Sequence, residues 1–107
     1  MRAQGILKLA SAGASAHRAA EGQFVLRLVA QDPFRAGLTT WHIRWTGLVA
    51  ETFWRRHGRQ LQPGRAVHVE LEDVHSLPGS CQREPAIGGK ARAVVLLPQW
   101  DETPAWT

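Results

Sequence analysis

Two consecutive segments place apolar side chains at alternate positions, and this pattern constrains the fold more than any other feature of the sequence. Side chains two residues apart on a strand lie on the same face. Residues 23–31 and 39–46 each divide their side chains between two faces in this way, which is typical of half-buried strands. The shared-face residues are Phe24, Leu26, Leu28 and Ala30 in the first segment, and Trp41, Ile43 and Trp45 in the second.

One helix is predicted directly after the second of these strands, over residues 48–57. Apolar residues recur there at the spacing of a helix that buries one face. Gly58 follows as a suitable C-terminal cap. The residues that define the apolar face are Val49, Ala50, Phe53 and Trp54.

Three further strands are predicted from shorter apolar alternations separated by turn residues. They cover residues 5–12, 65–74 and 90–97, with a loop or irregular hairpin over 11–22 and a long loop over 75–89. The resulting order is strand, strand, strand, short helix, strand, strand. That order predicts an all-β domain: a five-stranded OB-fold, a Greek-key barrel with one short helix between strands 3 and 4.

The length fits one domain, which we place at residues 1–98, followed by a short tail at 99–107. No apolar run approaches the length of a membrane span, and the first residues lack the apolar core of a secretory signal. A single cysteine, Cys81, is consistent with a reducing compartment. We therefore expect a cytoplasmic protein that does not enter a membrane.

The charge balance favours a polyanionic partner. The chain has 13 Lys and Arg against 9 Asp and Glu, a net charge of +4. Nucleic acid is the commonest partner for such a balance. A phosphate-binding loop, a dinucleotide fingerprint and a known metal-ligand spacing are all missing from the sequence. We therefore expect no enzyme activity, no cofactor and no metal.

The tryptophan strand admits two interpretations. Trp41 and Trp45 share a face, either as core residues together with Ile43 or as a platform on which bases stack beside positive charge. If the rings lie inside, the opposite face is exposed and Arg44 becomes the phosphate contact. The residue pattern alone leaves both interpretations open.

Other candidate contacts surround this strand. Phe34 and Arg35 lie in the predicted loop between the second and third strands, where Phe34 could stack on a base or anchor the loop. Basic residues at strand positions that could face outward are candidate contacts to the nucleic-acid backbone. They are Lys8, Arg27, Lys90 and Arg92.

Three segments in order resemble the bacterial single-stranded DNA-binding proteins. The resemblance rests on a Trp-His pair on a strand, a Gly-x-x-Ala-Glu helix start, and a Gly-x-x-Val-x-Val-Glu turn and strand. The primosomal replication proteins of the same superfamily have about this length. The segments are Thr40-Trp41-His42, Gly47-Leu48-Val49-Ala50-Glu51 and Gly64-Arg65-Ala66-Val67-His68-Val69-Glu70.

The resemblance implies a function and residue roles. It implies binding of single-stranded DNA in replication, recombination or replication restart, with replication or restart proteins as further partners. It implies a homo-oligomer, either a dimer or a tetramer. Trp41 matches the stacking tryptophan of the family, and His42 matches a histidine near its subunit contacts.

The chain also departs from the family pattern. The spacing from Trp41 to Gly47 is one residue shorter, and a one-residue shift of register exchanges the two faces of a strand. Leu71 stands where the family has glycine, and the long acidic tail is reduced to residues 101–107. An alternative function therefore stays open: a protein-interaction module, a primosomal-type adaptor whose aromatic residues form an oligomer or partner interface.

Overall fold

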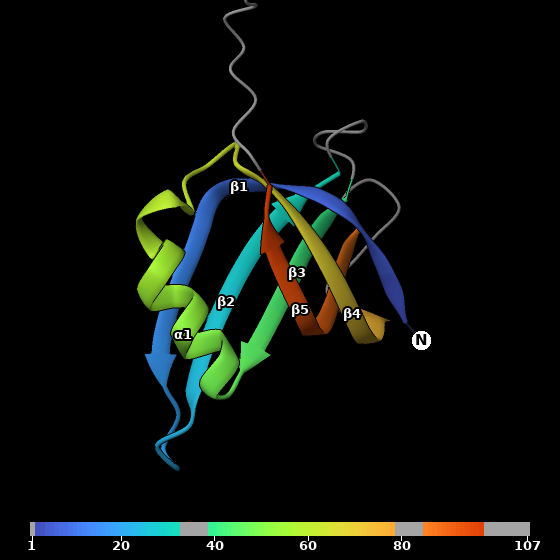
Figure 1. Cartoon of the computed structure of the whole chain (residues 1–107). Helices are drawn as coiled ribbons and strands as arrows, with labels where there is room; N and C mark the ends of the chain where they lie inside the picture. The colour runs from blue at the N-terminus through green and yellow to red at the C-terminus, as the bar shows by residue number, and fades with distance from the viewer. Residues whose placement is uncertain (1, 33–38, 79–84, 98–107) are drawn as a thin grey trace, which may run out of the picture.

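A strongly curved sheet makes up most of the protein. The computed structural model describes residues 2–32, 39–78 and 85–97, and within these ranges the chain forms five strands and one α-helix (Figure 1). The elements are β1 (Ala3–Arg18), β2 (Phe24–Gln31), β3 (Thr40–Thr46), α1 (Leu48–His57), a 3₁₀ turn (Gly58–Gln60), β4 (Ala66–Ser76) and β5 (Ala86–Leu96).

The strands pair in the order β1-β2-β3-β5-β4, and β4 also pairs with β1. The pairing of β3 with β5 is parallel, and the other four are antiparallel. The sheet therefore bends round on itself into a barrel-like shape, and α1 packs against β2 and β3 (Figure 1). The predicted all-β architecture, with a short helix between the third and fourth strands, is confirmed at this level.

The inward-facing side chains of the strands form a single core. On β2 the predicted face is confirmed, because Leu26, Leu28 and Ala30 are fully buried. On β4, Val67 and Val69 face the same core and are buried. Burying several such aliphatic side chains stabilises the fold by about 1.5–3 kcal/mol each, before the loss of chain entropy is counted.

The first strand is longer than predicted. Of the two alternatives for residues 11–22, the loop is wrong as far as Arg18, and the irregular hairpin is confirmed, because residues 14–18 pair with β2. β1 continues to Arg18 because it has partners along its length: residues 3–8 pair with β4, and residues 8–9 and 14–18 pair with β2. The register shifts between Leu9 and Ala14, and Gly13 in this interval has φ of 63°. An irregularity of this kind bends a strand. The residues in this part of β1 are small and polar, so the sequence pattern favours a loop there.

The last strand begins earlier than predicted. Residues 86–89 were placed in the long loop, but they form the part of β5 that pairs with β3. Gly88 and Gly89 are poor strand formers, so local propensity favours a loop there. Pairing on both sides, with β3 and β4, overrides that propensity.

The helix has the predicted bounds and ends at Gly58, the predicted C-terminal cap, but Val49 of the predicted apolar face is exposed. Gly58 has right-handed dihedrals, φ −54° and ψ −37°, and is the first residue of the 3₁₀ turn. Glycine is favoured there because a Cβ would lie 3.2 Å from the Trp54 ring. Val49 is exposed, and Ala50 provides the buried contact. No helix in the described ranges is long and apolar enough to span a membrane.

Candidate nucleic-acid interface

The two tryptophans of β3 face inward. Trp45 is 5% exposed, and its ring centroid lies 5.3 Å from that of Phe53 on α1. The interpretation of Trp45 as a stacking platform is therefore wrong in this structure, because too little of the residue is exposed for a base to stack on its ring. Trp41 is half-buried and packs against the core, so part of its ring is accessible. Ile43 lies between them and is 2% exposed.

The opposite face of β3 is exposed and carries a row of cations. Arg44 is directly opposite Arg27 on β2 and directly opposite Lys90 on β5. All three side chains are exposed. Neighbouring strands lie about 4.8 Å apart. We call these three residues the cationic row; it crosses three strands at right angles to the chain direction.

The charges of the cationic row are poorly compensated. Lys90 Nζ lies 3.4 Å from Asp73 Oδ2, and both side chains are 65% exposed. Within the described residues, Arg27 and Arg44 have no ion-pair partner. Like charges directly opposite on neighbouring strands repel. A bound polyanion would relieve that repulsion and contribute favourable electrostatic energy.

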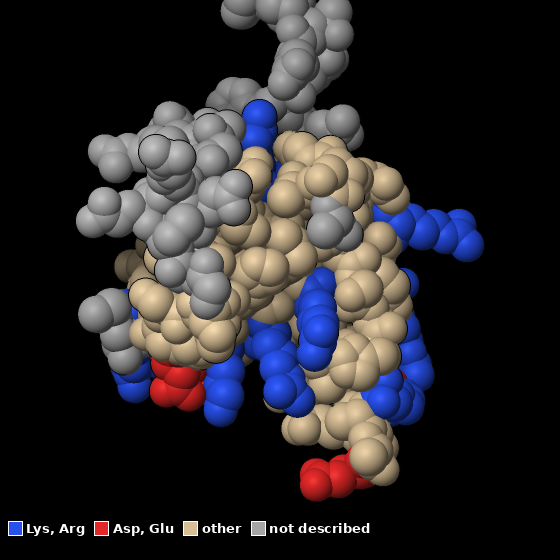
Figure 2. All heavy atoms as spheres, turned by 180° about the vertical axis from the view of Figure 1, so that it is seen from behind, with Lys and Arg blue, Asp and Glu red and all other residues tan. Residues whose placement is uncertain are grey.

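The wider surface shows the same sign of charge. Seen from behind, Lys and Arg side chains spread across the middle and lower part of the molecule, and the acidic side chains in this view lie at the lower margin (Figure 2). Two other predicted contacts lie away from the cationic row. Arg92 is exposed but has Glu72 beside it, with 3.9 Å between Nε and Oε2. Lys8 is exposed on β1, opposite Gln31 and Ala66.

His42 shares the outer face of β3 with Arg44. It is exposed and opposite Val29 and Gly88. His75 of β4 is opposite Gly88 on the other side. A Cβ on Gly88 would lie 3.1 Å from His75 Nε2, so glycine leaves room for this imidazole to lie over β5. The sequence pattern did not single out His75, because bulges in β4 and β5 set this pairing.

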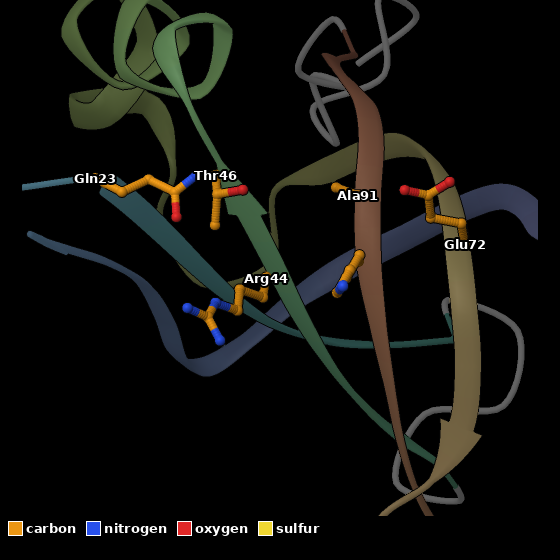
Figure 3. A pocket seen from close by; sticks show the side chains of 6 residues that line it. Gln23, Arg44, Thr46, Glu72 and Ala91 are labelled. Carbon is orange, nitrogen blue, oxygen red and sulfur yellow. The ribbon is translucent and has the colours of Figure 1, made fainter. Parts of the chain in front are cut away.

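A polar notch opens at one end of the cationic row. The pairing of β3 with β5 ends at Arg44 and Lys90, and beyond this point the two strands separate (Figure 3). The notch has a volume of about 320 Å³. Its lining comes from the residue before β2, from β3, from β4 and from β5, and consists of Gln23, Arg44, Thr46, Glu72, Lys90 and Ala91.

Sequence reasoning found two of these residues, Arg44 and Lys90, through their charge. It gave no binding role to the other four, Gln23, Thr46, Glu72 and Ala91. These residues come together at the point where β3 and β5, which are distant in the sequence, separate from each other. No local sequence pattern predicts that point. Other predicted elements, namely Phe34, Arg35, Cys81 and the tail at 99–107, lie outside the described residues.

No family model matches the chain. No curated protein matches it significantly. Any functional assignment therefore rests on the residues and their arrangement.

Proposed function

We propose that this protein binds single-stranded DNA and acts in replication, recombination or replication restart in the cytoplasm. The observation that carries the proposal is the cationic row, in which Arg27, Arg44 and Lys90 are opposite one another on three neighbouring strands. The resemblance to the bacterial single-stranded DNA-binding proteins points to the same partner.

The strand pairing supports an OB-fold Greek-key barrel as the finer description of the fold. In that fold five strands form the barrel, and oligonucleotides bind on one side of it between loops. The order β1-β2-β3-β5-β4, the pairing of β1 with β4 and the helix between β3 and β4 are the features that support it. The cationic row includes β2 and β3, the strands on which such domains hold their ligand.

Binding on this face is mainly electrostatic. Each arginine can donate two hydrogen bonds to one phosphate, and Lys90 adds a point charge. Stacking would contribute through the accessible part of Trp41 and not through Trp45. We therefore propose a binder that grips the backbone and has modest stacking. Its affinity is expected to fall steeply with salt, because released counterions drive the association.

The test is a titration of the purified protein with a fluorescent thymidine oligomer at low and at high salt. Anisotropy should rise on binding at low salt, and the affinity should fall as salt increases. A duplex of the same length is the control, and it should bind more weakly if single strands are the ligand. No binding of the oligomer at low salt would remove the proposal.

A second candidate function is a protein-interaction module, such as a primosomal-type adaptor. The observation that favours it is the exposure of two apolar side chains at the start of α1, Leu48 at 78% and Val49 at 68%. They border a groove that Phe53 and Trp45 also line. Tryptophan emission that changes with protein concentration, and not with oligonucleotide, would favour this function over DNA binding.

Self-association is part of the first proposal. Ile6 on β1 and Val95 on β5 are 47% and 54% exposed, and both are opposite His68 of β4 on the outer face. This apolar row is a candidate contact between copies in a dimer or tetramer. Light scattering should give the mass of an oligomer, and Val95→Glu should reduce it. A monomer at all concentrations contradicts the proposed assembly. His42 lies on the β3 outer face, so the implied role near a subunit contact stays a prediction.

A further inference from the structure

The notch next to the cationic row has the size and chemistry of a site for one nucleotide. Its volume of about 320 Å³ lies at the lower end of the range of small-molecule sites. Arg44 and Lys90 border it and belong to the cationic row. A strand whose phosphates contact that row would therefore bring a neighbouring base to the notch.

The notch also contains a carboxylate, which does not serve phosphate binding. Glu72 is directly opposite Lys90 on the neighbouring strand and lines the notch. Its nearest cation outside the notch is Arg92, at 3.9 Å, which is beyond hydrogen-bond distance. Within the described residues, no group donates a hydrogen bond to this carboxylate. Its acceptor capacity is therefore available to a ligand.

Two neutral polar side chains face the same space. The Gln23 amide and the Thr46 hydroxyl lie beside each other on the far side of the notch from Glu72 (Figure 3). Within the described ranges neither side chain makes a hydrogen bond. The notch thus offers donors and acceptors opposite the single acidic group.

We infer that the notch receives one base of the bound single strand and prefers guanine. This inference rests on the proposed function. A carboxylate accepts but cannot donate, so it selects base edges that present donors. Guanine presents two adjacent donors on its Watson–Crick edge, the N1–H and the 2-amino group, which match the two oxygens of a carboxylate. Single-stranded bases expose this edge. Thymine presents one donor between two carbonyl oxygens, which a carboxylate repels.

The experiment compares short thymidine oligomers that are identical except for one central nucleotide. That nucleotide is thymidine, guanosine or inosine, which keeps the N1–H of guanine but lacks the 2-amino group. We expect the guanosine oligomer to bind about tenfold more tightly than the thymidine oligomer, the range of one good bidentate base contact. Inosine should lose most of this gain. The measurement is anisotropy at one low salt concentration.

Two variants assign the preference to a residue. Glu72→Gln keeps the size of the side chain but donates on one side, so the guanosine oligomer should lose its advantage. Binding of the thymidine oligomer should stay equal or increase, because a negative charge beside Lys90 is removed. Glu70→Gln is the matched control. It removes the same charge from the same strand, from an exposed side chain opposite Ala93 that does not line the notch.

The outcomes separate this inference from the proposed function. Equal affinity for the thymidine and guanosine oligomers overturns the guanine preference and leaves DNA binding in place. A guanine preference that survives Glu72→Gln, or that Glu70→Gln also abolishes, overturns the role of the notch. Absence of salt-sensitive binding to all three oligomers overturns the proposed function and this inference with it. Circular dichroism of each variant confirms that the fold is retained.

Discussion

Replacing Arg44 by glutamine should weaken DNA binding and at the same time stabilise the folded protein. Arg44 is the central member of the cationic row and has a positive neighbour on each side, Arg27 and Lys90. Cross-strand pairs of this kind contribute roughly 0.2–1 kcal/mol each, with a destabilising sign for like charges. Replacing Arg44 by a neutral residue removes two of these repulsive pairs. We expect the free energy of unfolding to rise by about 0.5 kcal/mol.

The effect on binding follows from counting phosphates. On single strands, each neutralised phosphate adds about 0.7 to the magnitude of the slope of log affinity against log salt, so three contacts give a slope of about −2.1. Over a fourfold rise in salt, the affinity of the unmodified protein should fall by about 18-fold. With Arg44→Gln the slope should be about −1.4, and the fall about 7-fold.

The assay is anisotropy titration at several salt concentrations, paired with urea unfolding of the free protein. Arg59→Gln is the matched control, because it removes the same charge from an exposed residue in the 3₁₀ turn, away from the cationic row. That variant should keep the slope of the unmodified protein. If Arg44→Gln leaves the slope unchanged, or if Arg59→Gln lowers it equally, the cationic row is not the DNA contact.

Three further predictions concern the interior and its surroundings. Trp45→Ala should lower the free energy of unfolding by about 3–5 kcal/mol in a urea titration, because a large buried ring is lost. Gly58→Ala should reduce the thermal midpoint in calorimetry, since its Cβ would lie 3.2 Å from the Trp54 ring; an unchanged midpoint would show that the ring moves freely aside. Leu48→Ser should change the free energy of unfolding by less than about 0.5 kcal/mol, because its side chain is 78% exposed; a large loss would mean that Leu48 is buried in solution, as in an oligomer.

Local sequence patterns predicted an element correctly where it has the same neighbours along its whole length. β2 and β3 are short and carry alternating apolar residues that face one core, so their bounds follow from the sequence to within one residue. The direction in which the β3 tryptophans face does not follow from it. The helix was equally clear in its bounds. Local patterns failed for β1 and for the first half of β5, because these segments are small or glycine-rich and take their strand conformation from two neighbours.

The candidate site, too, could be predicted from the sequence only in part. The sequence made Arg27, Arg44 and Lys90 candidate backbone contacts on separate strands, and the role of Arg44 depended on the tryptophans lying inside. Their alignment in one row depends on the register between strands, which packing and turns set over the whole sheet. The notch beside Glu72 depends on the place where a parallel pair of strands separates.

The sequence alone indicated the type and order of the described strands and helix, and the excess of positive charge. Only the tertiary structure decided which way the tryptophan strand faces. Trp41, Ile43 and Trp45 occupy alternate positions and therefore share one face of the strand. An aromatic face of this kind can pack in a core or bind a ligand equally well. Packing of α1 over the β3 face settles the question, because Phe53 covers Trp45 and leaves Arg44 on the side open to solvent. Burial depends on what a neighbouring element covers, and that contact is not encoded within the strand itself.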